Sequence, residues 1–288
     1  MRPAASASSG ALTTEPGPPA GAPRPFDSTF GTPFDLNLIG LWTLYLKEVR
    51  RFLKVPGQTL AAPVVTTLMF MLIFQLALGR AGRLVGTLPF LEFLAPGLVM
   101  MALIQSAFAN TSSSLLIAKI QGNIVDLLMP PLRPGELMLG LVGGGVTRGL
   151  LVALAVTLAL LPFVSIVPAH PLLVLYYALA GALMMALLGL LGGLWAEKFD
   201  QMAALTNFLI TPLSFLSGTF YAIAQLPGPV QVIAHLNPFF YLIDGMRFGF
   251  TGHADGAIWL GMSAVLLVDL ALWLLAQNLI ARGWRLKA

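Results

Sequence analysis

Long apolar runs dominate the chain beyond its first 35 or so residues, and polar or Pro/Gly-rich stretches separate them. A helix needs about 20 apolar residues to cross about 30 Å of hydrocarbon. Continuous runs of this length argue against a β-barrel, whose strands are short segments of alternating polarity. The pattern predicts an all-α membrane protein with six transmembrane helices, at about residues 59–78, 92–115, 137–162, 171–195, 203–223 and 257–281.

The segment before these runs has a different composition. Residues 1–38 are rich in Ala, Ser, Gly and Pro, and they hold no apolar run that could form the core of a signal peptide. Such a stretch cannot bury enough surface to order itself. We therefore expect a disordered cytoplasmic tail over residues 1–38 and one membrane domain over residues 39–288.

An amphipathic segment opens this domain. In GLWTLYLKEVRRFLK, residues 40–54, the apolar positions share one helical face and the basic positions share the other. A basic amphipathic helix without a soluble domain to pack on is typical of a helix lying in the lipid headgroup plane. The charged positions of this predicted interfacial helix include Lys47, Glu48, Arg50 and Arg51, and Lys54 ends the segment.

Composition agrees with a membrane protein. Hydrophobic residues make up 57% of the 288 residues, charged residues only 10%, and the mean hydropathy is +0.85. A soluble domain carries roughly 25% charged residues, so this chain must be solvated by lipid. It has no cysteine, which excludes disulfides and thiolate metal sites, and its three histidines are scattered without metal-ligand spacing.

The distribution of basic residues predicts the orientation in the membrane. Cytoplasmic loops carry an excess of Lys and Arg. With both termini in the cytoplasm, the outer side carries Arg80, Arg83 and Arg247, and the inner side carries Arg2, Arg24, Lys47, Arg50, Arg51, Lys54, Lys119, Arg133, Lys198, Arg282, Arg285 and Lys287. The net charge of +4 is therefore a topology signal and gives no indication of nucleic-acid binding.

Two connections between the predicted spans are unusual. Residues 118–136 read AKIQGNIVDLLMPPLRPGE, a short, half-polar helix that prolines terminate on the cytoplasmic side. This segment is either a docking element for a soluble partner or a surface helix with no partner. Residues 226–250 are too apolar for a free loop, yet prolines and charges interrupt them, so we expect two short re-entrant or interfacial helices on the outer face.

Few residues are candidates for chemistry. The sequence holds no GxxxxGK[ST] phosphate loop, no GxSxG turn and no HExxH pair, which leaves an intramembrane hydrolase without support. Charges in hydrocarbon are costly, so Arg148 and Asp269, each near the middle of a predicted span, are functional candidates. They either pair, as a neutralising contact that fixes helix packing, or face an aqueous cavity.

Small and kinking residues predict how the spans pack. Gly140 with Gly144, Gly145 with Gly149 and Gly189 with Gly193 follow the small-xxx-small pattern, which permits close helix approach within one subunit or across a dimer seam. Pro63 and Pro212 are expected to kink their helices.

Several stretches resemble the permease subunit of the ATP-binding-cassette type-2 exporter family. Their order and spacing across about residues 40–282 make the combination specific. The stretches are KEVRRFLKVPGQTLAAPVV (47–65), LEFLAPGLVMM (91–101), SSSLLIAKIQGNIVDLLMPPLRPGELMLG (112–140), GGGVTRG (143–149), AEKFDQ (196–201), TPLSFLSGTFYAI (211–223) and LNPFFYLIDGMRFGFTG (236–252).

The resemblance implies a homodimer of six-span subunits in the bacterial inner membrane, with two copies of a separately encoded ATPase. ATP and Mg would bind to that partner, and this chain would bind no cofactor or metal. The implied activity is export of an amphipathic, lipid-linked or drug-like substrate from the cytoplasm. A stand-alone secondary transporter or channel is the alternative, although such proteins more often show internal repeats.

The resemblance also assigns residues. The outer re-entrant pair would include Asn237, Pro238, Asp244 and Arg247, and residues 40–54 would be the interfacial connecting helix. The coupling helix that contacts the ATPase would comprise Lys119, Ile120, Gln121, Asn123, Ile124, Asp126, Leu127 and Leu128.

Overall fold

The computed structural model describes residues 37–78, 84–85, 88–223 and 227–285, which all belong to one unit, residues 37–288. Residues 1–36 of the predicted tail lie outside the described residues. Arg80, Arg83 and Lys287, three of the basic residues that predict the orientation, also lie outside them.

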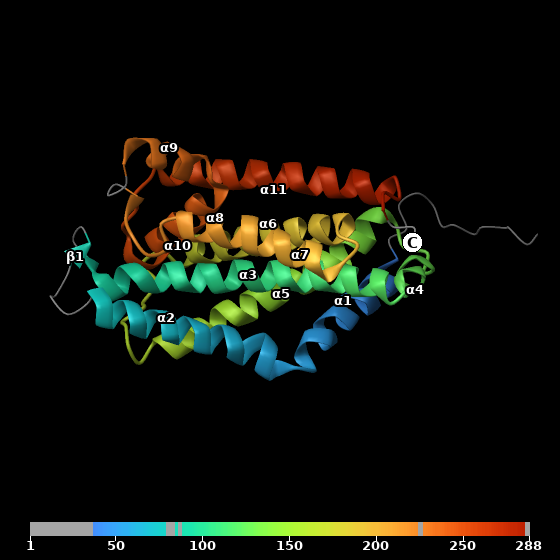
Figure 1. Cartoon of the computed structure of the whole chain (residues 1–288), viewed down its shortest axis with the longest axis horizontal. Helices are drawn as coiled ribbons and strands as arrows, with labels where there is room; N and C mark the ends of the chain where they lie inside the picture. Colours follow the sequence, from blue (N-terminus) through green and yellow to red (C-terminus); the bar gives the residue numbers. More distant parts are fainter. Residues whose placement is uncertain (1–36, 79–83, 86–87, 224–226, 286–288) are drawn as a thin grey trace, which may run out of the picture. The chain divides into compact units, whose positions relative to one another are not determined.

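Helices make up almost all of the described chain (Figure 1). The two strands, β1 (Leu84–Val85) and β2 (Leu88–Pro89), form a short antiparallel ladder. The helices are α1 (Leu38–Leu53), π-helical η1 (Gly57–Ala61), α2 (Ala62–Leu78), α3 (Phe90–Ile120), α4 (Ile124–Leu128), α5 (Pro134–Leu160), α6 (Pro171–Trp195), α7 (Phe199–Leu205), π-helical η3 (Thr206–Ile210), α8 (Thr211–Leu216), α9 (Gly228–Leu236), α10 (Pro238–Thr251) and α11 (Ile258–Ala281).

Five helices in the described part of the chain are long and apolar enough to cross a membrane: Gly57–Ala77, Phe90–Ile120, Pro134–Leu160, Pro171–Trp195 and Ile258–Ala281. They correspond to the first four predicted spans and the sixth. The fifth prediction, residues 203–223, falls on a helix in three parts, α7, η3 and α8, which ends at Leu216. At about 1.5 Å per residue this helix reaches roughly 25 Å. A sixth span therefore stays a prediction.

The two prolines that are expected to kink helices each follow a π-helical segment. Pro63 comes two residues after η1, and Pro212 comes two residues after η3. Proline lacks an N–H, and its ring clashes with the carbonyl group four residues earlier. The wider π-helical turn relieves that clash, which explains why both interruptions fall at these places.

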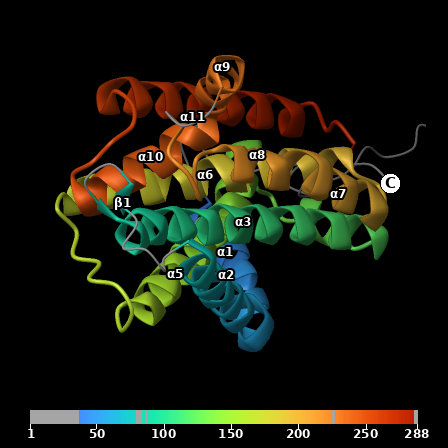
Figure 2. The ribbon, with the colours of Figure 1, turned by 60° about the vertical axis from the view of Figure 1, so that its left-hand side comes forward.

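The core of the unit is helix α3, which packs on α5 and α6. Glycines make this packing close: a Cβ atom at Gly189 of α6 would lie 2.5 Å from the Phe108 carbonyl oxygen, and one at Gly149 of α5 would lie 3.2 Å from that of Leu103. The glycine patterns of α5 and α6 therefore serve packing within one subunit. Helices α2 and α11 lie on opposite sides of this core (Figures 1 and 2).

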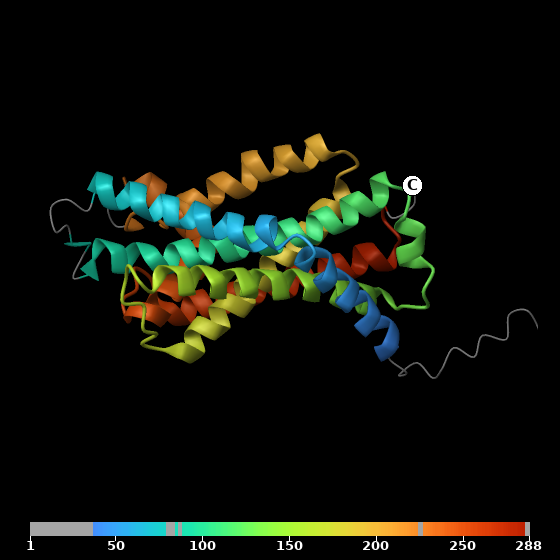
Figure 3. The same ribbon diagram turned by 90° about the horizontal axis from the view of Figure 1, so that it is seen from below.

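The helix expected at residues 40–54 is present as α1, which crosses α5 obliquely (Figure 3), and its interfacial position stays a prediction. Gly140 and Gly144 of α5 receive Leu44 and Glu48 of α1. At the start of both helices, the buried carboxylate of Glu136 accepts hydrogen bonds from the backbone N–H groups of Asn37 and Arg133, each at 2.8 Å. One carboxylate therefore joins the first turns of α1 and α5.

We expect Gly144→Ala to destabilise the protein, because the added Cβ would lie 2.5 Å from the Glu48 Cβ. Overpacking of this kind costs about 1–3 kcal/mol, and it would lower the thermal unfolding midpoint in detergent. Gly135→Ala is the matched control on α5, since nothing lies within 4 Å of its added Cβ. An unfolding midpoint for Gly144→Ala at or above that of Gly135→Ala would contradict the packing.

Candidate functional site

A buried polar network joins α1 to α3. Glu48 is only 1% exposed, and its carboxylate accepts hydrogen bonds from Ser114 Oγ at 2.7 Å and from Arg51 Nε at 3.1 Å. The Arg51 guanidinium also donates to the Asn110 carbonyl oxygen at 2.7 Å. Paired and hydrogen-bonded in this way, a charge can be buried at acceptable cost.

This network refines the prediction for the interfacial helix. Lys47 and Arg50 are exposed, where they can reach lipid headgroups, whereas Glu48 is buried and Arg51 is only partly exposed. The glycine face of α5 explains the difference, because it draws the stripe of Leu44, Glu48 and Phe52 inward.

At the C-terminal end of α3, a few residues beyond this network, Lys119 caps helix α6. Its Nζ donates to the carbonyl oxygens of Gly193 at 3.0 Å, Leu194 at 2.5 Å and Ala196 at 3.0 Å. Carbonyl groups in the last turn of a helix have no partner within the helix, and a cation there also favours the helix dipole. Lys119 therefore fixes the end of α3 to the end of α6.

The predicted coupling helix, residues 119–128, is wrong as a single element. Lys119 and Ile120 belong to the last turn of α3, and Gln121 to Asn123 form a turn before α4 begins at Ile124. Gly122 has φ +73°, a left-handed conformation that ends the helix and that glycine adopts without strain. The segment that was predicted to couple to the ATPase thus holds a five-residue helix, α4, after a glycine turn.

Helix α4 has one buried and one exposed face. Ile124 and Leu127 are buried in a cluster with Leu115 and Leu137 of the neighbouring helices. The residues between and beyond them are exposed, namely Val125, Asp126, Leu128 and Met129, of which Met129 is 74% exposed. Ile124 and Leu127 anchor the helix, so a partner can reach only the other face.

The predicted outer segment forms two helices, α9 and α10, and position 226 lies outside the described residues. Asn237, between the two helices, donates to the Leu213 carbonyl oxygen at 2.8 Å and to Ser217 Oγ at 2.9 Å. Pro238 is the first residue of α10. The Asn237 side chain thus holds this pair of helices to the end of α8.

Asp244 and Arg247 form a buried ionic cluster on α10. Arg247 is 2% exposed; it donates to the Gly218 carbonyl oxygen at 2.6 Å and stacks on the Phe93 ring, with Cζ 3.8 Å from the ring centroid. Its Nη1 lies 3.8 Å from Asp244 Oδ1 and 3.5 Å from Asp255 Oδ2. Burial raises the pKa of the Asp244 carboxyl, against the opposing effects of backbone N–H donors and the Arg247 charge. Arg247 therefore holds helices together inside the unit. Because its charge is buried and paired, it contributes little to the count of loop charges that predicts the orientation in the membrane.

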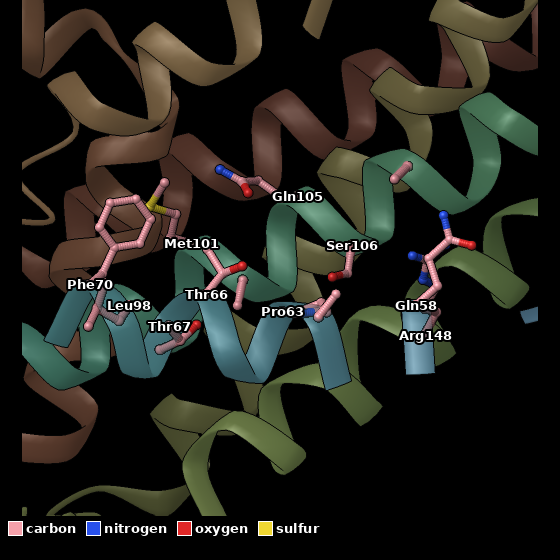
Figure 4. Close-up of a pocket in the computed structure, with 13 residues that line it drawn as sticks. Gln58, Pro63, Thr66, Thr67, Phe70, Leu98, Met101, Gln105, Ser106 and Arg148 are labelled. Carbon is pink, nitrogen blue, oxygen red and sulfur yellow. The ribbon is translucent and has the colours of Figure 1, made fainter. Parts of the chain in front are cut away.

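Arg148 and Asp269 do not pair within the chain. Arg148 lies on α5 and lines a cavity with residues of α2 and α3, whereas Asp269 lies on α11 (Figure 4). Arg148 Nε and Asp269 Oδ1 are both buried without a hydrogen-bond partner among the described residues. The pairing hypothesis fails within the chain, and Arg148 lines a cavity that Asp269 does not reach; an aqueous cavity stays a prediction.

These features define a polytopic helical membrane protein with an ordered helix pair at one end and a small exposed helix at the other. The ABC-2 type transporter family matches residues 40–251. The chain belongs to this family, and it is a permease subunit of an ABC transporter in the inner membrane, a transport component rather than an enzyme.

Curated relatives agree with this assignment. The chain is 37% identical over 254 residues to the inner membrane transport permease YadH of Escherichia coli strain K12, which covers 88% of this chain and 99% of the relative. It is 28% identical over 243 residues to nodulation protein J of Neorhizobium galegae, with 81% and 88% covered. It is 27% identical over 229 residues to nodulation protein J of Sinorhizobium fredii, with 77% and 84% covered. Membership in the family implies a separate ATPase partner.

Other groups were not singled out from the sequence. Glu136 and Ser114 join helices through partly buried hydrogen bonds, but a lone polar residue in an apolar run gives no sign of its partner. Within the described ranges, no group of three His, Asp or Glu residues is placed to hold a metal ion.

We expect Lys119→Met to loosen the end of α6, because three carbonyl groups lose a charged donor. Hydrogen bonds to charged groups contribute about 1.5–3 kcal/mol, so amide hydrogen exchange around residues 193–198 should accelerate about tenfold. Lys198→Met is the control, since Lys198 is exposed in the same connection. Equal exchange in the two variants would argue against the cap.

Asp244→Asn should destabilise the helix pair α9 and α10, because it removes a buried charge that faces Arg247. Breaking a buried ion pair costs about 3–5 kcal/mol, and Asp255 offsets part of the loss. Thermal unfolding in detergent measures the effect against Asp200→Asn, an exposed carboxylate. If the two variants unfold at the same temperature, the cluster is not a structural tie.

Proposed function

We propose that this chain is the transmembrane permease of an ATP-driven exporter that moves an amphipathic, lipid-linked or drug-like substrate out of the cytoplasm. The observation that supports it best is the exposed face of α4, at the end of the membrane unit, in a chain of the ABC-2 type transporter family. The sequence holds no GxxxxGK[ST] phosphate-binding loop, so the energy for transport would come from ATP hydrolysis by another protein. Two copies of a separately encoded ATPase would supply this work and would bind the ATP and Mg.

Two basic residues, Lys119 and Arg285, lie against the last turn of α6 and the residues that follow it. Arg285 donates to the Trp195 carbonyl oxygen at 2.6 Å and lies 3.5 Å from Glu197, which joins the end of α11 to the turn after α6. Lys119 caps α6 beside that turn. Basic residues at this end support a cytoplasmic location for it and for both termini.

Force applied to α4 would have two routes into the bundle. The buried side chains of Ile124 and Leu127 pass it to α5 and α6 through their shared cluster. Lys119 passes it from the end of α3 to the end of α6. Since α3 is the packing core of the unit, a shift at α4 would move the bundle as a body and bias it between inward-open and outward-open states.

The proposal includes a homodimer. In the helix Gly57–Ala77, which contains α2, only 11% of the most apolar 18-residue stretch is buried inside the subunit. Phe208 on η3 is 85% exposed. Lipid or a second copy must cover such surfaces. A seam between two copies along α2 and η3 would then border the cavity that Arg148 lines, since α2 forms one of its walls.

We expect Met129→Glu and Asp126→Arg, on the exposed face of α4, to abolish co-purification of the ATPase and its stimulation by the chain. A like-charge or desolvated charge in a docked interface costs several kcal/mol. His253→Glu, an exposed position after α10, is the control. ATPase binding at the wild-type level in both α4 variants, while the chain stays folded, would refute α4 as the contact.

A further inference from the structure

We propose that the cavity lined by Arg148 binds the anionic headgroup, a phosphate or carboxylate, of an amphiphile whose tail lies along α2. The cavity measures about 290 Å³ and lies between the start of the first span, α3 and α5 (Figure 4). The site stands on this geometry alone, and only its assignment to exported cargo rests on the proposed function.

Arg148 lacks a counter-charge in the described chain. Its Nε is buried without a hydrogen-bond partner, and none of the described carboxylates forms an ion pair with it. Glu48 is already engaged by Arg51 and Ser114, and Asp269 lies on α11. An uncompensated guanidinium at membrane depth is costly, so an anion that enters the cavity would gain a strong, unshared partner.

The lining changes from polar to apolar along the cavity. Gln58, Ser106 and Arg148 lie toward one end in Figure 4, and Phe70, Leu98 and Met101 lie toward the other, with the hydroxyl-bearing Thr66 and Thr67 beside them. A free inorganic anion would leave the apolar end unused, whereas an amphiphile would fill both ends. The gradient therefore favours an anionic lipid-like molecule over a soluble ion.

The chemistry of the Arg148 side chain also favours an anion of this kind. A guanidinium offers planar, forked donors that match phosphate and carboxylate oxygens.

Because the chain has no cysteine, single-cysteine variants report on the cavity without background. Thr66→Cys lies on the cavity wall and Thr43→Cys on the exposed side of α1. The measured quantity is the rate ratio, the labelling rate of an anionic methanethiosulfonate reagent divided by that of a cationic one. We expect this ratio to be higher in Thr66→Cys alone than in Thr66→Cys with Arg148→Gln. The rate ratio should fall about fivefold for loss of one nearby charge, and Arg148→Lys should largely keep it.

Controls make this outcome specific. Arg282→Gln, which removes an exposed charge at the end of α11, should leave the ratio at Thr66→Cys unchanged, and Arg148→Gln should leave the ratio at Thr43→Cys unchanged. If Arg148→Gln leaves the ratio at Thr66→Cys unchanged, the anion site is refuted. Neither measurement needs the ATPase, so a failed exporter proposal would not alter it.

Amphiphiles with the same tail identify the occupant. Dodecyl phosphate should slow labelling of Thr66→Cys, and dodecyl trimethylammonium should not. If the anion is cargo, dodecyl phosphate also raises ATP hydrolysis by the assembled complex, and Arg148→Gln removes the rise. If it is a resident membrane lipid, hydrolysis is unchanged and native mass spectrometry finds phosphatidylglycerol retained by the wild type and lost from Arg148→Gln. The proposal is overturned if dodecyl phosphate does not slow labelling, does not raise ATP hydrolysis, and the wild type retains no phosphatidylglycerol.

Discussion

Close contact between backbones in the centre of the bundle is the constraint on which the rest of the structure depends. Lipid tails are as apolar as leucine, so helices in a membrane associate mainly through tight packing and hydrogen bonds. Here the glycines of α5 and α6 admit α3, and those nearer the start of α5 admit α1. Buried polar groups then join the same helices: Glu48 and Arg51 join α1 to α3, and Lys119 joins α3 to α6.

This arrangement separates a packed interior from two ends of different character. At one end, Asn237, Asp244 and Arg247 tie α10 to α8 and to the start of α3. Near the other, α4 is anchored by two buried side chains and leaves a small exposed face. Between them, Arg148 remains a charge without a partner inside the described chain. A subunit built in this way can receive force at α4 and offer a polar site within an apolar surround.

The sequence was enough to predict five of the spans, the helix at residues 40–54 and the two helices of the outer segment, because long apolar runs, 3.6-residue periodicity and proline are local signals. The division at Gly122 was missed because the sequence does not show which glycine in a half-polar stretch adopts the left-handed conformation. The family resemblance placed Ile124 in the helix that contacts the ATPase, but its side chain packs inward. Glu48 with Arg51 and Asp244 with Arg247 are spaced three residues apart on one helix, a local signal for pairing that was not used, whereas their burial depends on the tertiary packing. The pairing of Arg148 with Asp269 was considered, and the two residues do not pair within the described chain.

The central claim is that this chain supplies the membrane path and a separate ATPase supplies the work. The most direct measurement reconstitutes the purified chain into vesicles of native lipid extract, with and without its ATPase partner, and follows labelled amphiphiles across the bilayer with ATP or ADP. We predict net movement only when the partner and ATP are both present. Equal movement by the chain alone, without nucleotide, would contradict the account.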